Sequence, residues 1–216
     1  MSIILETADC RDFGKTIAPK SVKLVMADPV YQEEWQYVYS IMTAQDILTD
    51  DGSLLLFYGG NKEHTYVTAM LAAADKMKWC WPLQYTVVAK KNMVHAYRTF
   101  TWTTRLWWFA RKGSKSKPNR AIVDTYISHT APTGKYKWNK NLAVIEYYLS
   151  AFTVEGDLVV DFFAGGGSVA RACKRLNRSY YGCEIDPKVA EQSRKLIELE
   201  PVPAIVVEPT QMEAML

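Results

Sequence analysis

Short runs of consecutive apolar residues alternate along this chain with longer stretches in which apolar residues recur every three or four positions. The short runs are rich in β-branched and aromatic side chains, which is typical of strands. The predicted strands are Ser21–Ala27, Ser53–Tyr58, Leu83–Ala89, Arg105–Ala110, Asp157–Phe162 and Ser179–Cys183.

The longer periodic stretches predict helices, each lying between two of these strands or after the last one. The predicted helices are Glu33–Leu48, Lys62–Met77, Asn139–Phe152, Ser168–Asn177 and a last helix opened by Asp186 and Pro187. Asp51 and Gly52 predict a turn before the strand at Ser53. Strands that alternate with helices indicate an α/β fold, a mostly parallel, doubly wound sheet with helices on both faces.

A chain of 216 residues fits one domain. We expect that domain to span residues 1–200, with a loosely held, proline-containing tail at 201–216. Inside the domain, Lys90–Thr104 is polar and aromatic without a clean period and is predicted to be a loop. We expect residues 90–138 as a whole, which include the predicted strand Arg105–Ala110, to be a basic loop region that contacts nucleic acid.

The composition is that of an ordinary globular protein, with 49% apolar and 23% charged residues. No apolar run approaches the roughly 18 residues of a membrane span, and the charged first dozen residues predict that there is no signal peptide. The four cysteines and three histidines are scattered. We therefore expect a cytoplasmic protein with neither a disulfide framework nor a metal site and with no membrane partner.

The net charge of +3 hides an uneven distribution. Between Asp75 and Asp124 the chain has eleven basic residues, nine aromatic residues and no acidic residue, whereas residues 1–60 carry nine acids against four bases. This pattern is typical of a polyanion binder, although a solvated basic face on a tryptophan-rich core would look the same. The predicted nucleic-acid contacts are Lys90, Lys91, Arg98, Arg111, Lys112, Lys115, Lys117 and Arg120.

A glycine-rich turn follows the strand that ends near Asp161 and precedes the helix that begins at Ser168. Glycines let a backbone approach a ligand closely, and a helix N-terminus offers free N–H groups and positive potential. Asp161 can hold an amino group of a ligand. Glu184, 17 residues after Gly167, can accept both ribose hydroxyls of an adenosine.

Two other interpretations of this turn stay open. The spacing of Gly165, Gly167 and Ala170 also fits the dinucleotide-binding pattern of a dehydrogenase. That pattern starts only about 50 residues before the end of the chain, which disfavours a second nucleotide-binding half after it. A purely structural turn is the third interpretation, and three consecutive glycines are a costly way to build one.

The run from Asp161 to Ser168 resembles the Asp-x-Phe-x-Gly-x-Gly-Ser cofactor motif of the permuted (beta-type) DNA amino-methyltransferases. The tetrapeptide Asp28-Pro29-Val30-Tyr31 resembles their Asp-Pro-Pro-Tyr catalytic motif, and the catalytic motif comes first, as in that family. The resemblance implies a Rossmann-like methyltransferase sheet, S-adenosyl-L-methionine as cofactor and DNA as substrate.

The resemblance also implies which residues hold the cofactor. Phe163, Ala164 and the glycines would wrap its methionine part, and Glu184 would bind its ribose. Ala8-Asp9-Cys10 resembles a Gly-Asp-Cys segment whose aspartate lies near the adenine, and Asn139-Lys140 matches the Gln-Lys of a His-x-Thr-Gln-Lys-Pro segment. The implied cofactor residues are Asp9, Asn139, Lys140, Asp161, Phe163, Ala164, Gly165, Gly167, Ser168 and Glu184.

For catalysis, the resemblance implies that Asp28 and the Pro29 carbonyl accept hydrogen bonds from the target amino group while Tyr31 stacks on the extruded base. Aspartate rather than serine at position 28 resembles the adenine-modifying members of the family, and this resemblance favours adenine N6 over cytosine N4. Val30 stands where the family has a second proline, so a catalytically weakened relative stays an alternative. An RNA amino-methyltransferase and an ordinary strand-to-loop turn at Asp28 are further alternatives.

Only about 28 residues separate Arg111 from Asn139, where relatives insert a recognition region. This length suits a hairpin or a loop, so we expect short or relaxed sequence specificity dominated by phosphate contacts. A partner or a second copy of the chain could supply further recognition. Trp102, Trp107 and Trp108 are candidates to flank the base, or core residues of the strand at Arg105–Ala110.

Overall fold

A computed structural model describes residues 1–30, 33–58, 63–76, 84–90, 103–110, 113, 115–122, 125–128 and 140–201. In chain order the elements are β1 (Ile3–Thr7), α1 (Cys10–Phe13), a 3₁₀ turn η1 (Gly14–Thr16), β2 (Val22–Ala27), α2 (Glu34–Ile47), β3 (Leu48–Tyr58), α3 (Glu63–Lys76), β4 (Gln84–Lys90), β5 (Thr103–Phe109), β6 (Thr125–Ser128), α4 (Leu142–Phe152), β7 (Leu158–Asp161), α5 (Ser168–Arg175), β8 (Ser179–Glu184) and α6 (Pro187–Leu199). In these ranges no helix is both long and apolar enough to cross a membrane.

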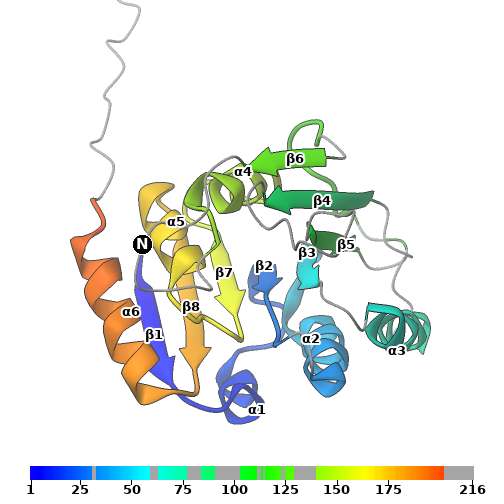
Figure 1. Cartoon of the computed structure of the whole chain (residues 1–216), viewed down its shortest axis with the longest axis horizontal. Coiled ribbons are helices and arrows are strands. Elements are labelled where there is room, and N and C mark those ends of the chain that lie inside the picture. Colours follow the sequence, from blue (N-terminus) through cyan, green and yellow to red (C-terminus); the bar gives the residue numbers. More distant parts are fainter. Residues whose placement is uncertain are drawn as a thin grey trace, which may run out of the picture.

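The described strands form one eight-stranded sheet in the order β1-β8-β7-β2-β3-β5-β4-β6 (Figure 1). In this order the first five strands, β1, β8, β7, β2 and β3, are each parallel to their neighbours. β5 is antiparallel to both β3 and β4, and β4 and β6 are parallel. The predicted mostly parallel α/β sheet is therefore confirmed.

The C-terminal strands β7 and β8 lie between the N-terminal strands β1 and β2. From β7 the chain continues through α5 to β8 in one direction, and from β2 it continues through α2 to β3 in the other direction. The β2–β7 pair is thus the point where the winding of the sheet reverses. In open α/β sheets, ligands bind outside the carboxyl ends of the strands at such a switch point.

Helices cover both faces of the sheet, as predicted, and each face has its own apolar core. α4, α5 and α6 pack on one face, and α1, α2 and α3 pack on the other. Neighbouring residues of β5 point to opposite faces, so Trp108 lies in the first core and Trp107 in the second. Both tryptophans are buried, which confirms the core interpretation for these two positions. Trp102 lies outside the described residues.

Local signals explain where several helices begin. Asp186 caps α6 by accepting hydrogen bonds from the N–H groups of Lys188 and Val189, and Pro187 occupies the first turn, as the sequence predicts. Asn141 caps α4 in the same way, so this helix begins at Leu142 rather than at the predicted Asn139.

One turn prediction is wrong. Asp51 and Gly52 lie inside β3, which is continuous from Leu48 to Tyr58. Val22 pairs with Leu48 and Leu24 pairs with Ser53, so β3 has extra residues opposite β2 at this point. The Asp-Gly pair therefore lies in an irregular part of a continuous strand rather than in a turn before it. The short elements β1, α1 and β6 were not predicted from the sequence.

Candidate active site

Two aspartates mark the carboxyl ends of the strands at the switch point. Asp28 follows the last residue of β2, and Asp161 is the last residue of β7. The two strands are adjacent and parallel, with Leu24 opposite Val159 and Val25 opposite Val160. The predicted catalytic segment and the predicted cofactor loop consequently meet at the same edge of the sheet, although about 130 residues of sequence separate them.

The Asp28 carboxylate forms an ion pair with the ammonium of Lys140, just before α4. The pair is sheltered, since the Asp28 side chain is 28% exposed and that of Lys140 is 14% exposed. Lys140 uses only Oδ2. The other oxygen, Oδ1, is buried and has no hydrogen-bond partner among the described residues. A buried acceptor without a partner costs free energy, so Oδ1 is a candidate to accept a hydrogen bond from a ligand.

Lys140 also joins the two halves of the site. Its side chain binds Asp28, and its backbone carbonyl accepts a hydrogen bond of 3.3 Å from the hydroxyl of Ser168, the first residue of α5. The sequence assigned Lys140 to the cofactor. The structure instead pairs its ammonium with the carboxylate of Asp28, and a role toward the cofactor stays a prediction. Asn139 lies outside the described residues.

Hydrogen bonds hold the glycine-rich turn between β7 and α5, the glycine loop, in one conformation. Gly167 is the N-cap of α5 with φ +74°, and Gly165 has φ +49°. The Ala164 N–H donates to the Cys183 carbonyl at 2.9 Å, and the Gly167 N–H donates to the Ala164 carbonyl at 2.8 Å. Ser193 of α6, which was not predicted from the sequence, donates its hydroxyl to the Gly165 carbonyl at 2.6 Å. These bonds fix the loop before any ligand arrives.

The effect of a substitution at a glycine of this loop can be compared with that of the same substitution at a glycine elsewhere in the chain. An Ala at Gly167 would carry the strain of a positive φ, and its Cβ would lie 3.3 Å from the Cβ of Ser193. We expect Gly167→Ala to lower the free energy of unfolding by about 1–2 kcal/mol and to weaken cofactor binding as well. Gly156→Ala is the matched control, because Gly156 has φ +86° with nothing within 4 Å. Denaturant unfolding and cofactor titration of both variants check this; equal cofactor affinity in both would contradict it.

Asp161 is buried, and its carboxylate accepts a hydrogen bond of 2.9 Å from the Phe163 N–H. Burial raises the pKa of Asp161 to about 7, and the negative charges of Asp28 and Glu184 act in the same direction. Three carboxylates therefore gather at this edge of the sheet. A site of this kind favours a ligand that carries positive charge.

Glu184 ends β8 and lies beside the glycine loop. Its Oε2 accepts from the Gly165 N–H and its Oε1 from the Asp186 N–H, both at 2.9 Å. Each carboxylate oxygen can accept more than one hydrogen bond. Glu184 is therefore held in place and can still accept from two neighbouring hydroxyl groups, as the ribose assignment requires.

Asp9 lies on the adjacent strand end, since β1 pairs with β8 and the Ala8 N–H donates to the Glu184 carbonyl at 3.1 Å. Its carboxylate accepts from the backbone and the guanidinium of Arg11 at 2.7–2.9 Å. These hydrogen bonds lower the pKa of Asp9 to about 2. The Arg11 guanidinium also lies over the Trp35 ring at 5.1 Å and so connects Asp9 to the start of α2.

The predicted nucleic-acid residues are only partly described. Lys115 and Lys117 are exposed. Arg120 lies against α4, where it donates to the Tyr147 carbonyl at 3.0 Å and to the Ser150 hydroxyl at 2.8 Å. These bonds compete with a phosphate contact from Arg120. The backbone of Lys90 belongs to β4. Lys91, Arg98, Arg111 and Lys112, together with Tyr31 of the tetrapeptide, lie outside the described residues.

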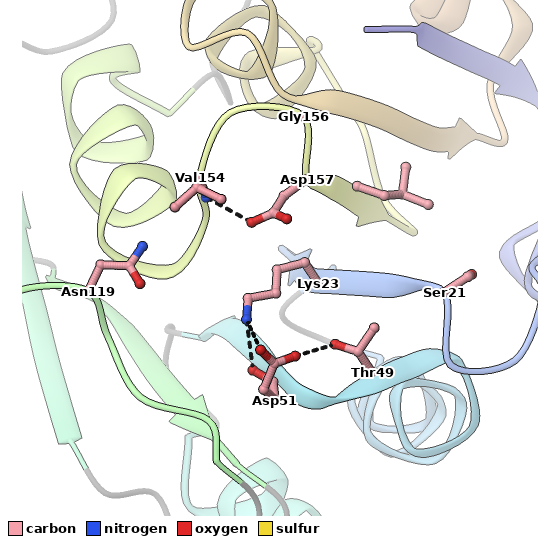
Figure 2. A pocket seen from close by; sticks show the side chains of 9 residues that line it. Ser21, Lys23, Thr49, Asp51, Asn119, Val154, Gly156 and Asp157 are labelled. Carbon is pink, nitrogen blue, oxygen red and sulfur yellow. Dashed lines mark hydrogen bonds and ion pairs between the residues drawn. The ribbon is translucent and has the colours of Figure 1, made fainter.

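A shallow pocket of about 500 Å³ lies at the opposite edge of the sheet, near the amino ends of β2 and β7 (Figure 2). Its charged groups are already engaged: Lys23 pairs with Asp51 at 2.6 Å, and Asp157 accepts from the Val154 N–H at 2.7 Å. This hollow is far from the glycine loop, and none of the buried side-chain atoms that lack a hydrogen-bond partner among the described residues belongs to its lining. The candidate chemistry therefore belongs to the carboxyl edge.

Comparison with known proteins agrees with this arrangement. A family model described as DNA methylase, covering the N6 and N4 enzymes, matches residues 22–195. The chain therefore belongs to the N6/N4 DNA methylase family, and it is an S-adenosylmethionine-dependent DNA amino-methyltransferase.

Two curated relatives illustrate the range of similarity. The type II methyltransferase M2.DpnII of Streptococcus pneumoniae is 22% identical over 246 residues, covering 92% of this chain and 90% of that protein. The type II methyltransferase M1.MboII of Moraxella bovis is 30% identical over 88 residues, covering 41% of this chain and 30% of that protein. The first alignment extends over nearly the whole chain.

Solved structures confirm the Rossmann-like methyltransferase fold. The complex of M1.HpyAVI with S-adenosylmethionine aligns with a TM-score of 0.75 at 19% identity and covers 90% of this chain and 98% of that one. The PvuII cytosine-N4-specific DNA methyltransferase aligns with a TM-score of 0.74 at 17% identity and covers 88% of this chain and 84% of that one.

The residues at the carboxyl edge fit this cofactor. S-adenosylmethionine carries a sulfonium and an ammonium group, and three carboxylates face this edge. The backbone at Gly165 is open, since a Cβ built there would meet nothing closer than the Phe163 carbonyl oxygen at 3.9 Å. The fixed loop, the held carboxylate of Glu184 and the open side of Gly165 are what a nucleoside with an amino acid tail requires.

Proposed function

We propose that this enzyme methylates the N6 amino group of adenine in DNA, and that Asp28 and the Pro29 carbonyl are the acceptors that activate the amine. The observation that carries this proposal is the buried, unpartnered Oδ1 of Asp28, located at the switch point beside the glycine loop. Lys140 holds the other carboxylate oxygen and leaves this one for the substrate.

The chemistry explains why acceptors are needed. The lone pair of an aromatic amine is delocalised into the ring, and its N–H groups are too weakly acidic for a side chain to deprotonate first. Hydrogen bonds from both N–H groups to Asp28 and to the Pro29 carbonyl would favour a tetrahedral nitrogen and aim its lone pair. The nitrogen would then take the methyl group that bound S-adenosylmethionine supplies on sulfur, and Asp28 or water would accept the proton that the methylated nitrogen releases. Preorganised groups of this kind are worth about 3–4 kcal/mol each.

We assign the cofactor contacts to three groups of this chain. The carboxylate of Asp161 would hold the amino group, Glu184 the ribose hydroxyls, and the loop from Phe163 to Gly167 the methionine part. When bound, the cofactor supplies an electrophilic methyl group on sulfur. Support for these roles comes from the burial of Asp161, the bonds that orient Glu184 and the shape of the loop.

The test is methyl transfer from tritiated S-adenosylmethionine to plasmid DNA, followed by digestion to nucleosides. We expect the label in N6-methyldeoxyadenosine. Label in N4-methyldeoxycytidine would overturn the adenine assignment. Label that appears with transfer RNA and not with duplex or single-stranded DNA would favour the RNA alternative. A wild-type protein that binds cofactor without any turnover would support the weakened-relative alternative that Val30 raises.

Sequence specificity gives a separate prediction. Because few residues are available for base recognition, we expect methylation at short or degenerate sites, with phosphate contacts dominating affinity. Labelled duplexes of varied sequence, assayed between 50 and 200 mM salt, should show a steep loss of binding with salt, of the kind made by several phosphate contacts. A strict site of six or more base pairs read by one copy of the chain would contradict this prediction. Recognition of that length would require a second copy or another partner.

A further inference from the structure

The third residue of the catalytic tetrapeptide has a partner that a proline could not have. The Val30 N–H donates a hydrogen bond of 2.8 Å to Oε1 of Gln36, in the first turn of α2. The Val30 carbonyl accepts from the Glu33 N–H at 2.9 Å. The Val30 side chain itself is 58% exposed. Its backbone therefore makes two hydrogen bonds that connect the tetrapeptide to the start of α2.

The Val30 N–H belongs to the same peptide unit as the Pro29 carbonyl. A trans peptide unit is planar, and its N–H and C=O point in opposite directions. A bond that fixes the N–H therefore fixes the direction of the carbonyl as well. Hydrogen bonds also polarise one another along a chain, so donation by the N–H strengthens the carbonyl as an acceptor.

Gln36 is well placed to act as an anchor. Its backbone N–H donates to the Glu33 carbonyl at 3.0 Å, and its carbonyl accepts from the Ser40 hydroxyl at 2.8 Å. The next residue, Tyr37, is fully buried in the core under this face of the sheet. The position of the Gln36 side chain is thus set by a packed helix and not by the loop that it binds.

We propose that Gln36 is the positioning residue for the Pro29 carbonyl, and that it replaces by a hydrogen bond the restraint that a second proline supplies covalently. A proline at position 30 would fix its own φ and restrict residue 29 to extended conformations. Valine gives up both restraints but exposes an N–H, and Gln36 binds it. This inference rests on the proposed function, because the Pro29 carbonyl matters only if it accepts the target amine.

The experiment is a double-mutant cycle on the full chain, with kcat and KM measured for tritiated S-adenosylmethionine and plasmid DNA. Gln36→Met keeps the size of the side chain and removes the acceptor. We expect kcat to fall by about 5- to 15-fold, the effect of one hydrogen bond, with both KM values within about twofold of wild type. Gln36→Glu keeps an acceptor and should retain kcat within about threefold. Gln45→Met, at the far end of α2, is the matched control and should equal wild type.

The decisive comparison uses Val30→Pro, which has no N–H to donate. We expect Val30→Pro to stay within about threefold of wild type, because proline restores the covalent restraint, and Gln36→Met to have no further effect on it. The same loss of kcat in both backgrounds would overturn the proposal. A folding defect of Gln36→Met, seen in thermal unfolding and equal in both backgrounds, would overturn it too.

These outcomes are distinct from a failure of the proposed function. If Gln36→Met equals wild type while Asp28→Asn is inactive, the positioning role is wrong and the amine-acceptor mechanism stands. If Asp28→Asn keeps the wild-type rate, the acceptor mechanism itself is wrong.

Discussion

Asp28→Asn is expected to lower kcat by about two to three orders of magnitude while cofactor affinity stays within about threefold of wild type. The buried Oδ1 is the proposed acceptor for the target amine, and an asparagine can present an N–H₂ group there instead of an oxygen. Removal of one preorganised group typically costs about 10²- to 10³-fold in kcat. Single-turnover methylation with saturating cofactor and DNA measures this loss directly.

A matched control separates the lost acceptor from the lost ion pair. Asp51→Asn makes the same substitution in another lysine–aspartate pair, Lys23–Asp51, at the opposite edge of the sheet. It should leave kcat and cofactor affinity unchanged. If Asp28→Asn loses cofactor binding in parallel with turnover, the carboxylate serves the cofactor pocket rather than the amine. Equal turnover in Asp28→Asn and wild type would exclude Asp28 from the reaction.

The meeting of the two motifs could be predicted because it follows from simple rules. Asp28 and Asp161 each end an apolar run, and the ends of parallel strands lie at one edge of a sheet. The order of the strands could not be read from the same pattern. That β7 and β8 lie between β1 and β2 depends on which strands pair, and pairing between residues far apart in the chain leaves no periodic signal.

Side-chain partners were harder to predict than backbone positions. Lys140 was recognised as a site residue, but its ion pair with Asp28 joins residues 112 positions apart and needs the tertiary fold. Gln36 could have been suspected, because an amide one helical turn into α2 lies close to the tetrapeptide. The sequence distance between Gln36 and Val30 does not by itself predict that the Gln36 side chain binds the Val30 N–H. Ser193 was missed for the same reason, since it meets the glycine loop only when α6 packs beside α5.

The incorrect prediction of a turn at Asp51-Gly52 shows that a local sequence signal can mark an irregular backbone without marking the end of a strand. This dipeptide does lie where the backbone is irregular, but the irregularity is a register shift inside a continuous strand. The tryptophans show the opposite case. The sequence around them left base contact and core packing equally open. Because neighbouring side chains of β5 point to opposite faces of the sheet, Trp107 and Trp108 are each buried in one of the two cores.

The buried carboxyl of Asp161 leads to a second large effect, this time on stability. Its pKa of about 7 lies well above the ordinary value near 3.9 for an unfolded chain. Between pH 4 and pH 7 the unfolded state is ionised while the folded state keeps its proton, so the free energy of unfolding falls as pH rises through this window. Above pH 7 both states are ionised and the loss is constant. One pKa unit corresponds to about 1.4 kcal/mol, so the full loss is about 4 kcal/mol.

Asp161→Asn should therefore stabilise the cofactor-free protein by up to about 4 kcal/mol at pH 8 and by almost nothing at pH 4. The same variant should lose cofactor affinity, because the carboxylate proposed to hold the amino group is gone. Denaturant unfolding from pH 4 to pH 9 and calorimetric titration with S-adenosylmethionine measure the two effects. A gain in stability together with a loss of cofactor affinity would identify Asp161 as a group that destabilises the cofactor-free protein but is needed to bind the cofactor.

Asp51→Asn again provides the control, with the opposite sign of pH dependence. The hydrogen bond from Lys23 lowers the pKa of Asp51, so the stability that this carboxylate adds is present above its unfolded pKa and is lost as pH falls. Asp51→Asn should then be slightly less stable than wild type at pH 8, because the pair is partly exposed and contributes little. If Asp161→Asn instead destabilises the protein at every pH, the carboxylate is held by partners that stabilise its charge, and its proposed role as a poised site for a cationic group is wrong.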